Sequence, residues 1–288
     1  MMGDSSVVTK AERPHLLGLD RQSLAELLRS WGESPFRANQ ILQWLHTRQV
    51  TDFAAMTNIS KALRARLAAE TCINEPEIIA DQLAADRTRK WLLGLLDGNA
   101  IETVFIPEED RGTLCISSQV GCSLACSFCA TGAQGLSRNL ETHEIIAQVR
   151  VARRFLGLDA ITNIVFMGMG EPLLNLRQVL PALDLLRDDY AYGFGARRIT
   201  VSTAGVVPGM DRLGTESPVN LAISLHASKP PLPAGGVARC LPPLSLAAPT
   251  PHHLRICDAG WYQRCRHPCP GTSPLTARHP CYGKFNPL

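Results

Sequence analysis

The sequence predicts an α/β fold, in which a parallel sheet follows a small helical unit. Three helical patterns follow one another between Ser23 and Ala69, strand-like runs with a hairpin turn occupy 90–117, and helical and strand-like segments alternate over 142–225. Such alternation indicates βα units around a parallel sheet. These strands form either a barrel or an open doubly wound sheet. Both arrangements place loop chemistry at the carboxyl ends of the strands.

The N-terminal helices are recognised by their start signals. Ser23-x-x-Glu26 reads as a capping box at the start of the first helix. Ser34 offers an N-cap for the second helix, with Pro35 at its first position. The third helix carries Leu63 and Leu67 at helical spacing. A unit of this kind serves as a docking module or as a nucleic-acid reader, and its spacing favours neither.

The strands and later helices follow in order. Apolar runs at 91–96 and 101–106 are separated by Asp97-Gly98-Asn99, which predicts a hairpin, and a third strand is expected at 113–117. The remaining segments are expected to alternate as helix 142–155, strand 161–167, helix 176–186, strand 198–203 and strand 219–225.

Composition indicates a globular chain. It has 288 residues, of which 45% are hydrophobic, enough for a sizeable core. The N-terminal segment has no apolar signal region, and no stretch reaches the roughly 18 apolar residues that span a membrane. We therefore expect a cytoplasmic location and no membrane contact. In that setting the ten cysteines favour metal binding or redox chemistry over disulfides.

The net charge of +3 gives no support for RNA binding, because its excess lies in the tail. Residues 229–288 carry seven Lys or Arg against one acid, Asp258, which leaves 22 basic and 25 acidic side chains in residues 1–228. Local basic patches remain, at Arg87, Arg89 and Lys90 and at Arg197 and Arg198.

Cys122, Cys126 and Cys129 form a Cys-x3-Cys-x2-Cys set. Three closely spaced thiolates can hold three irons of a four-iron cluster, which leaves one iron open to a substrate or cofactor. This pattern therefore indicates chemistry. The alternatives are a zinc knuckle that lacks its fourth ligand, or three cysteines packed in a core.

Other polar or glycine residues recur where the predicted strands end. Residues 168–172, Gly-Met-Gly-Glu-Pro, follow an apolar strand directly, so the glycines allow a ligand close to backbone amides, with Glu171 as an acceptor. Ser202 ends the next strand, and Ser224, Leu225 and His226 end the one after it. These positions predict one site at the carboxyl edge of the sheet.

Five segments together resemble a known family. They are Glu102 within 101–107, the run 115–132 from Cys115 to Gly132, residues 168–172, Val-Ser-Thr-Ala-Gly at 201–205, and Ile-Ser-Leu-His-Ala at 223–227. The chain from about residue 17 to residue 227 closely resembles the radical-SAM methyltransferases that modify carbon-2 of adenine in 23S ribosomal RNA and in transfer RNA.

The resemblance implies a fold and a set of roles. The expected fold is a radical-SAM partial (β/α) barrel, incomplete in this chain, with a helical RNA-docking domain and linker at 1–88 and the radical-SAM core at 89–228. Cys122, Cys126 and Cys129 would bind a [4Fe–4S] cluster. Glu102 matches the proton acceptor and Cys115 the resolving cysteine. The residues matched to S-adenosylmethionine contacts are Gly170, Glu171, Ser202, Ser224, Leu225 and His226.

It also implies a reaction and partners. The family methylates one of its own cysteines with a first cofactor molecule, and a second molecule supplies the radical that activates this methyl group. The adduct with adenine is then resolved when another cysteine forms a disulfide with the carrier. The expected partners are 23S rRNA and tRNA and a flavodoxin-like electron donor, with the chain acting as a monomer.

The resemblance stops after about residue 228. Twelve of the twenty prolines and five of the ten cysteines lie in residues 229–288, so we expect an aberrant, disordered tail that does not complete the sheet. Codons exist that let 252–272 read in a second frame as a segment resembling the family's next part, which suggests a frameshift. No tail cysteine matches the methyl carrier. We therefore expect this polypeptide, as written, to be inactive.

Two alternatives to this function remain. The sister enzymes that methylate carbon-8 of the same adenine share the cysteines, although the N-terminal pattern and the context of Glu102 favour carbon-2. The second alternative is a non-catalytic, truncated RNA-binding product. Other radical-SAM reactions explain the three cysteines but not Cys115 or the full set of motifs.

Overall fold

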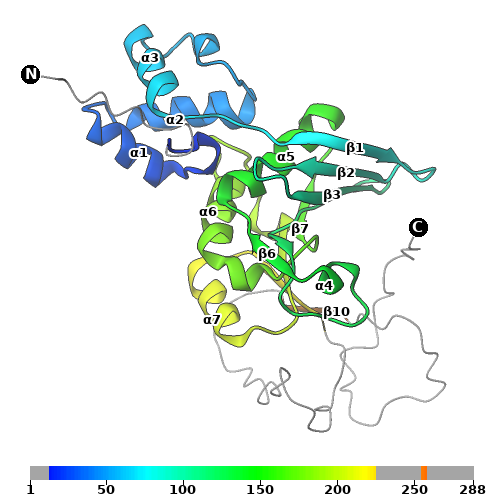
Figure 1. The fold of residues 1–288 in the computed structure, drawn as a ribbon. Helices are drawn as coiled ribbons and strands as arrows, with labels where there is room; N and C mark the ends of the chain where they lie inside the picture. Colours follow the sequence, from blue (N-terminus) through cyan, green and yellow to red (C-terminus); the bar gives the residue numbers. More distant parts are fainter. Residues whose placement is uncertain (1–12, 225–253, 258–288) are drawn as a thin grey trace, which may run out of the picture. The chain divides into compact units, whose positions relative to one another are not determined.

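The computed structural model describes residues 13–224 and the backbone of residues 254–257 (Figure 1). Its helices of eight residues or more are α1 (Arg21–Ser30), α3 (Lys61–Glu70), α5 (Thr142–Leu156), α6 (Leu176–Arg187) and α7 (Val207–Glu216). The shorter ones are α2 (Phe36–Leu42), α4 (Ala130–Gln134), and the turns η1 (Leu16–Gly18), η2 (Gln43–Thr47), η3 (Phe53–Ala55), η4 (Pro172–Asn175) and η5 (Ala196–Arg198). None of these helices is long and apolar enough to cross a membrane.

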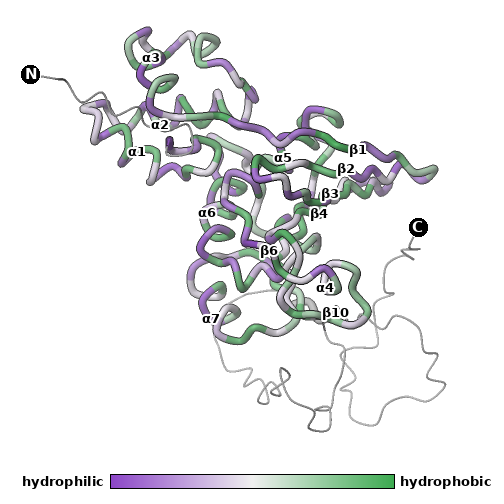
Figure 2. The backbone as a smooth tube through the Cα atoms, in the orientation of Figure 1, coloured by the Kyte–Doolittle hydropathy of each residue, from purple (hydrophilic) through white to green (hydrophobic). Residues whose placement is uncertain are grey.

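The three expected N-terminal helices are present, but their caps differ from the prediction. Asp20, and not Ser23, caps α1: its side chain accepts the Ser23 N–H at 2.7 Å, which places Ser23 inside the first turn. No side chain caps α2, and Pro35 immediately precedes the helix. Ser60 caps α3, in which Leu63 and Leu67 are buried as expected. Hydrophobic residues on α1 alternate with hydrophilic ones, as in an amphipathic helix (Figure 2).

Eight strands form one sheet in the order β1-β2-β3-β4-β7-β8-β9-β10. They are β1 (Glu77–Leu83), β2 (Arg89–Gly94), β3 (Ala100–Pro107), β4 (Gly112–Cys115), β7 (Asn163–Phe166), β8 (Ile199–Thr203), β9 (Asn220–Ser224) and β10 (Leu254–Cys257). The first four run antiparallel to their neighbours, and β4, β7, β8, β9 and β10 run parallel. Over the described residues the sheet is open between β1 and β10, which confirms the partial α/β barrel.

Two strands of this sheet were not expected. β1 lies in the stretch that the sequence assigns to a linker; five of its seven residues are exposed and it lies at the sheet edge, which gives it no alternating pattern. β10 lies in the tail that was expected to remain outside the sheet. The rest of the tail lies outside the described residues.

The two faces of the sheet differ in burial. Residues of β3, β4, β7 and β8 alternate between buried and half-buried. Helix α5 covers the buried face: Thr103 on β3 donates to Gln148 on α5 at 2.8 Å, and Trp91 on β2 contacts the ring of Phe155. The other face is left half-open and carries the residues of the candidate site.

A separate pair of short strands lies beside the sheet. β5 (Gln119–Gly121) and β6 (Leu136–Asn139) pair antiparallel, with an irregularity at Val120 and Gly121. They bracket α4 and the three closely spaced cysteines. Neither strand is predicted from the sequence, because each is too short to show an alternating pattern.

We expect the stability of this chain to fall as the pH drops below about 6.5. Burial, followed by the charges of Arg150 and Arg153, lowers the pKa of the fully buried His46 from 6.5 to about 3. The unfolded chain therefore binds more protons between these values, which costs up to about 1.4 kcal/mol per pH unit for this one group. Urea denaturation at pH 7 and pH 5 measures the loss.

His46→Gln is the matched variant for this prediction. Its side chain can still reach the hydroxyl of Tyr192, which lies 3.3 Å from His46 Nδ1, but it does not titrate. The variant should lose less stability between pH 7 and pH 5 than the parent does. An equal loss in both proteins would show that other groups control the pH dependence.

Candidate functional site

Residues from four strands share the half-open face of the sheet. Cys115 on β4 pairs with Val104 on β3 and with Val165 on β7, and Val165 pairs with Thr200 on β8. Paired residues point to one face, as do residues two apart on a strand. Glu102, Cys115 and Ser202 therefore lie on the same face, and the pairing of Ser202 with Ala222 adds Ser224.

Glu102 lies at the edge of this face, beside the loop that follows β7. Its half-exposed carboxylate forms an ion pair with Lys90 on β2 at 3.1 Å. Its backbone N–H donates to the sulfur of Met169 at 3.4 Å, and its carbonyl accepts from the Ser117 hydroxyl at 2.6 Å. Because the Glu102 carboxylate is half-exposed and pairs with Lys90, it can also contact a ligand on the open face.

Cys115 ends β4 on the same face. Burial raises the pKa of its thiol to about 12, and a hydrogen bond with the backbone of Met167 offsets this only in part. The thiol is therefore protonated at neutral pH. Because the thiolate is the reactive form, Cys115 needs a base, or a change in its surroundings, before it reacts.

Glycines lie where the segments before and after the cysteine loop, residues 122–129, come into contact. Gly121 has φ 76°, and a Cβ there would lie 1.8 Å from the carbonyl oxygen of Gly135. The Cys122 N–H donates to the same oxygen at 3.0 Å, which joins the start of the loop to its return. The Cys129 N–H donates to the Cys126 carbonyl at 3.0 Å, and α4 begins directly afterwards.

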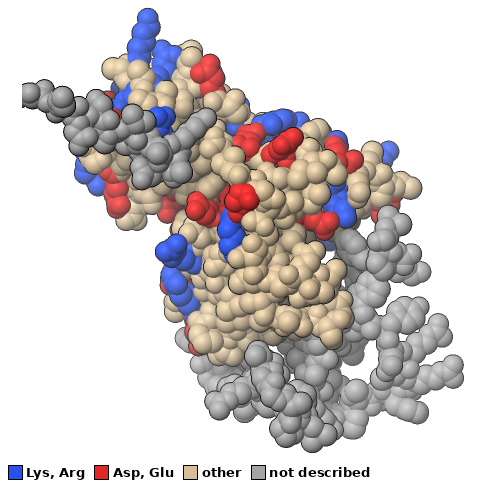
Figure 3. Space-filling view, viewed as in Figure 1, with Lys and Arg blue, Asp and Glu red and all other residues tan. Residues whose placement is uncertain are grey.

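The three cysteines form an isolated set of ionisable groups. Cysteines are the only ionisable side chains from Gly112 to Ser137, and Figure 3 shows a surface without charged side chains around α4. Burial, followed by the charges of Cys122 and Cys129 and then of Glu171, raises the pKa of Cys126. The thiolates therefore repel one another, and a cationic centre between them would relieve that repulsion.

Three cysteines on one loop offer ligands of the kind that an iron–sulfur cluster uses. Among the described residues, no group of three or more His, Cys, Asp or Glu side chains is gathered to hold a metal ion. Ligands of one zinc ion must converge on one point, whereas thiolates of a four-iron cluster bind separate irons. The three thiols are partly exposed and lie on one loop, so each can bind a separate iron.

The glycine loop, residues 168–172, packs tightly against the segment after β4. A Cβ on Gly168 would lie 2.7 Å from the Ser117 hydroxyl and 2.9 Å from the backbone of Ile116. The Met169 carbonyl accepts the N–H groups of Ser118 and Gln119 at 2.9 and 3.1 Å. Glycine is required here for close packing against this segment.

Glu171 connects the loops that follow β7 and β8. Its side chain is buried, and its carboxylate accepts the N–H of Leu173 at 3.1 Å and the N–H of Ala204 at 2.9 Å. Burial raises its pKa, and the two backbone hydrogen bonds act in the opposite direction. The remaining lone pairs of the carboxylate can still accept a donor from a ligand.

The structure thus brings together most of the residues predicted from sequence. Glu102, Cys115, Ser202 and Ser224 share one face, Gly170 and Glu171 lie on the glycine loop, and the charge of Glu171 acts on Cys126. Leu225 and His226 lie outside the described residues.

Ser117 and Gln119 were missed as parts of the site. Both are buried polar residues between β4 and the cysteines, and both bond to the glycine loop. The sequence feature that could have indicated them is the run of polar residues Ser117, Ser118 and Gln119 at the end of an apolar strand. In the basic patch predicted at Arg87, Arg89 and Lys90, Arg89 pairs with Asp81 and Lys90 pairs with Glu102.

Two family models match this chain. Residues 14–73 match the ribosomal RNA large subunit methyltransferase N-terminal domain. Residues 116–239 match the radical SAM superfamily. The first range contains the N-terminal helices, and the second begins between β4 and the cysteine loop.

Curated relatives carry one description, dual-specificity RNA methyltransferase RlmN. The relative from Alkalilimnicola ehrlichii is 57% identical over 74% of this chain and 60% of its own length. The one from Halorhodospira halophila is 52% identical over 85% of this chain and 67% of its own length. The one from Marinobacter nauticus is 53% identical over 75% of this chain and 60% of its own length. The chain thus spans 60 to 67% of these relatives.

A solved structure shares the fold. The crystal structure of a radical SAM methyltransferase from Sphaerobacter thermophilus matches with a TM-score of 0.69 and 43% sequence identity. The match covers 74% of this chain and 64% of that one.

Proposed function

Since this chain belongs to the RlmN family of radical SAM RNA methyltransferases, we propose that it represents an enzyme that methylates carbon-2 of adenine in 23S rRNA and in tRNA. One observation carries the proposal. The glycine loop is bonded on one side to Gln119, on the strand that leads into the cysteine loop, and on the other side to Glu102, which shares its sheet face with Cys115.

The cofactors of the superfamily are a [4Fe–4S] cluster and S-adenosylmethionine. Cys122, Cys126 and Cys129 would hold the cluster, which supplies the electron for reductive cleavage of S-adenosylmethionine when it is bound. We assign the cofactor's polar groups to Gly170, Glu171, Ser202 and Ser224, with Leu225 and His226 as further expected contacts.

Two residues are proposed for the transfer itself. Glu102 would accept the proton that leaves the adenine ring, because its carboxylate lies on the open face and is held only by Lys90. Cys115 would resolve the protein–RNA adduct as a disulfide. Its thiol, protonated at neutral pH, is protected from premature reaction until a base removes the proton.

The partners follow from the same family assignment. The helices that match the N-terminal domain model would dock 23S rRNA and tRNA. A flavodoxin-like protein would supply electrons. We expect a monomer that acts in the cytoplasm.

Whether this polypeptide completes the reaction is a separate prediction. Cofactor cleavage and methyl transfer are therefore measured separately. The carbon-8 methyltransferases are the second candidate, because they share the cysteines and much of the mechanism.

The test uses reconstituted chain with S-adenosylmethionine, a reductant, and unmodified 23S rRNA or tRNA. Nucleosides from the digested RNA are separated and compared by mass and retention with 2-methyladenosine and 8-methyladenosine. 5′-Deoxyadenosine is measured in the same reaction. A control with Cys126→Ala detects cleavage that does not depend on the cysteine loop.

The outcomes distinguish the candidates. 2-Methyladenosine in both RNAs supports the proposal and overturns the expected inactivity. 8-Methyladenosine favours the sister activity. 5′-Deoxyadenosine without methylation supports the radical SAM assignment and contradicts methyl transfer by this polypeptide, and the absence of both products contradicts the assignment.

A further inference from the structure

Gln119 is a buried polar residue between the cysteine loop and the glycine loop. It lies on β5, shortly before Cys122, and is 1% exposed. The transfer chemistry proposed above gives it no role. A buried amide must satisfy both its oxygen and its nitrogen, so its partners show what it holds together.

The two ends of the Gln119 amide bond to different segments. Its oxygen accepts the backbone N–H of Glu171 at 2.7 Å, in the glycine loop. Its nitrogen donates to the side-chain oxygen of Asn139 at 2.7 Å, on the strand that returns from the cysteine loop. Asn139 is also the residue that pairs with Gln119 across β5 and β6. One side chain thus connects both loops.

The glycine loop is pressed against this side chain. A Cβ on Gly170 would lie 2.4 Å from the Cβ of Gln119 and 2.8 Å from its amide oxygen, and Gly170 has φ 95°. The Gln119 N–H also donates to the Met169 carbonyl at 3.1 Å. The loop therefore follows the position of Gln119 closely.

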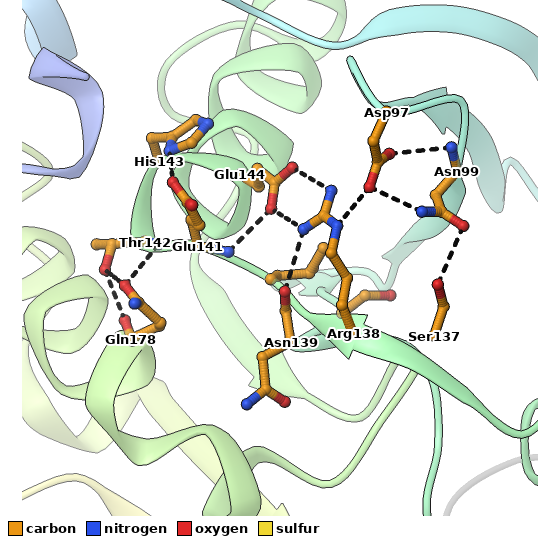
Figure 4. Close-up of polar contacts among 12 residues, drawn as sticks. Asp97, Asn99, Ser137, Arg138, Asn139, Glu141, Thr142, His143, Glu144 and Gln178 are labelled. Atoms are coloured by element: carbon orange, nitrogen blue, oxygen red, sulfur yellow. Dashed lines mark hydrogen bonds and ion pairs between the residues drawn. The ribbon is translucent and has the colours of Figure 1, made fainter. Parts of the chain in front are cut away.

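The other end of the connection is anchored. Arg138, next to Asn139 on β6, lies between Asp97 in the β2–β3 turn and Glu144 in the first turn of α5 (Figure 4). It contacts Glu144 at 2.7 Å, and these two carboxylates raise the pKa of Arg138. Figure 4 shows the Asn139 side chain directed away from this cluster. Strand β6 is thereby fixed to the hairpin and to α5.

We propose that Gln119 is a positioning residue for S-adenosylmethionine: it holds the glycine loop at a fixed distance from the cysteine loop. The inference rests on the proposed function, in which the cysteine loop holds the cluster and the glycine loop contacts S-adenosylmethionine. Misplacing one loop relative to the other weakens that binding and leaves the three thiols intact.

The test compares Gln119→Met with Asn139→Ala. Gln119→Met removes both side-chain bonds at similar volume. Asn139→Ala removes only the anchor, and because the position is exposed the variant is expected to fold. The matched control is Gln178→Met, because Gln178 is also a tether, accepting from Thr142 between α6 and α5, and touches neither loop.

The readout is cofactor binding to the reconstituted cluster. We expect Gln119→Met to retain its iron and the electron paramagnetic resonance spectrum of its reduced cluster. The dissociation constant for S-adenosylmethionine should rise at least tenfold, and the change that the cofactor induces in the spectrum should be lost. Asn139→Ala should show a smaller rise, and Gln178→Met none. Binding within twofold of the parent in both test variants overturns the inference.

Amide hydrogen exchange on the iron-free protein separates this inference from the proposed function. Gln119→Met should exchange at Glu171 at least tenfold faster than the parent, and Gln178→Met should not. An unchanged rate contradicts the coupling whether or not a cluster forms. A parent chain that binds no S-adenosylmethionine contradicts the proposed function, while the exchange experiment still tests the connection.

Discussion

Replacing Cys126 with alanine is expected to lower the iron bound by the reconstituted chain at least tenfold. The parent should hold about four irons per chain if the cysteine loop binds a four-iron cluster. Cys126 is the central member of the set, and the charges of Cys122 and Cys129 act on it. Two remaining thiolates leave two irons without protein ligands, so the cluster should not persist.

Iron and sulfide analysis and the absorption spectrum after anaerobic reconstitution measure this effect. Cys72→Ala is the matched control, because Cys72 follows α3 and lies outside the loop. The iron-free variants should differ little in stability from the parent, since Cys126 is partly exposed. Zinc bound in place of iron would favour the zinc knuckle. Iron retained in full by Cys126→Ala would show that the loop is not the cluster site.

Replacing Glu75 with glutamine is expected to lower the free energy of unfolding by about 3–5 kcal/mol, the cost of leaving a buried charge without its partner. The Arg150 side chain is fully buried on α5, and its guanidinium bonds to the Glu75 carboxylate at 2.6–2.7 Å. It also donates to the backbone carbonyls of Leu45 and Val50. This arrangement joins the N-terminal helical segment to the core.

Urea denaturation of the parent and variants tests this expectation. Arg154 bonds to the same carboxylate but is half-exposed, so Arg154→Ala should cost about 1 kcal/mol or less. The double variant Glu75→Gln with Arg150→Met removes the stranded charge and should be more stable than Glu75→Gln alone. Equal losses for Glu75→Gln and Arg154→Ala would indicate that the buried pair contributes no more than an exposed one.

Local sequence patterns were sufficient for most of the fold. Helix α5 begins at the predicted Thr142 and extends to Leu156, one residue beyond the prediction, because its apolar residues recur at helical spacing. The hairpin turn at Asp97-Gly98-Asn99 was also confirmed: Gly98 has φ 84°, a conformation that glycine adopts without strain.

The elements that were not predicted lack a local sequence pattern. Strand β1 is an exposed edge strand, and β5 and β6 have three and four residues, so none carries an alternating apolar pattern. The capping box was misread because Asp20 and Ser23 both offer a side-chain oxygen near the start of α1. Which one caps depends on where the chain enters the helix, and contacts with the rest of the protein decide that.

The sequence by itself determined which reactive groups are available. It supplies three thiols at fixed spacing and glycines after an apolar strand. A carboxylate and a further cysteine lie on strands that come before the cysteine loop. Only the tertiary structure decided which of these residues meet. The register of β3, β4, β7 and β8 places Glu102, Cys115 and Ser202 on one face. The Gln119 amide joins two loops that are distant along the chain. Residue types and local spacing are properties of the sequence alone. Strand pairing and buried hydrogen bonds depend on contacts that form only when the chain folds.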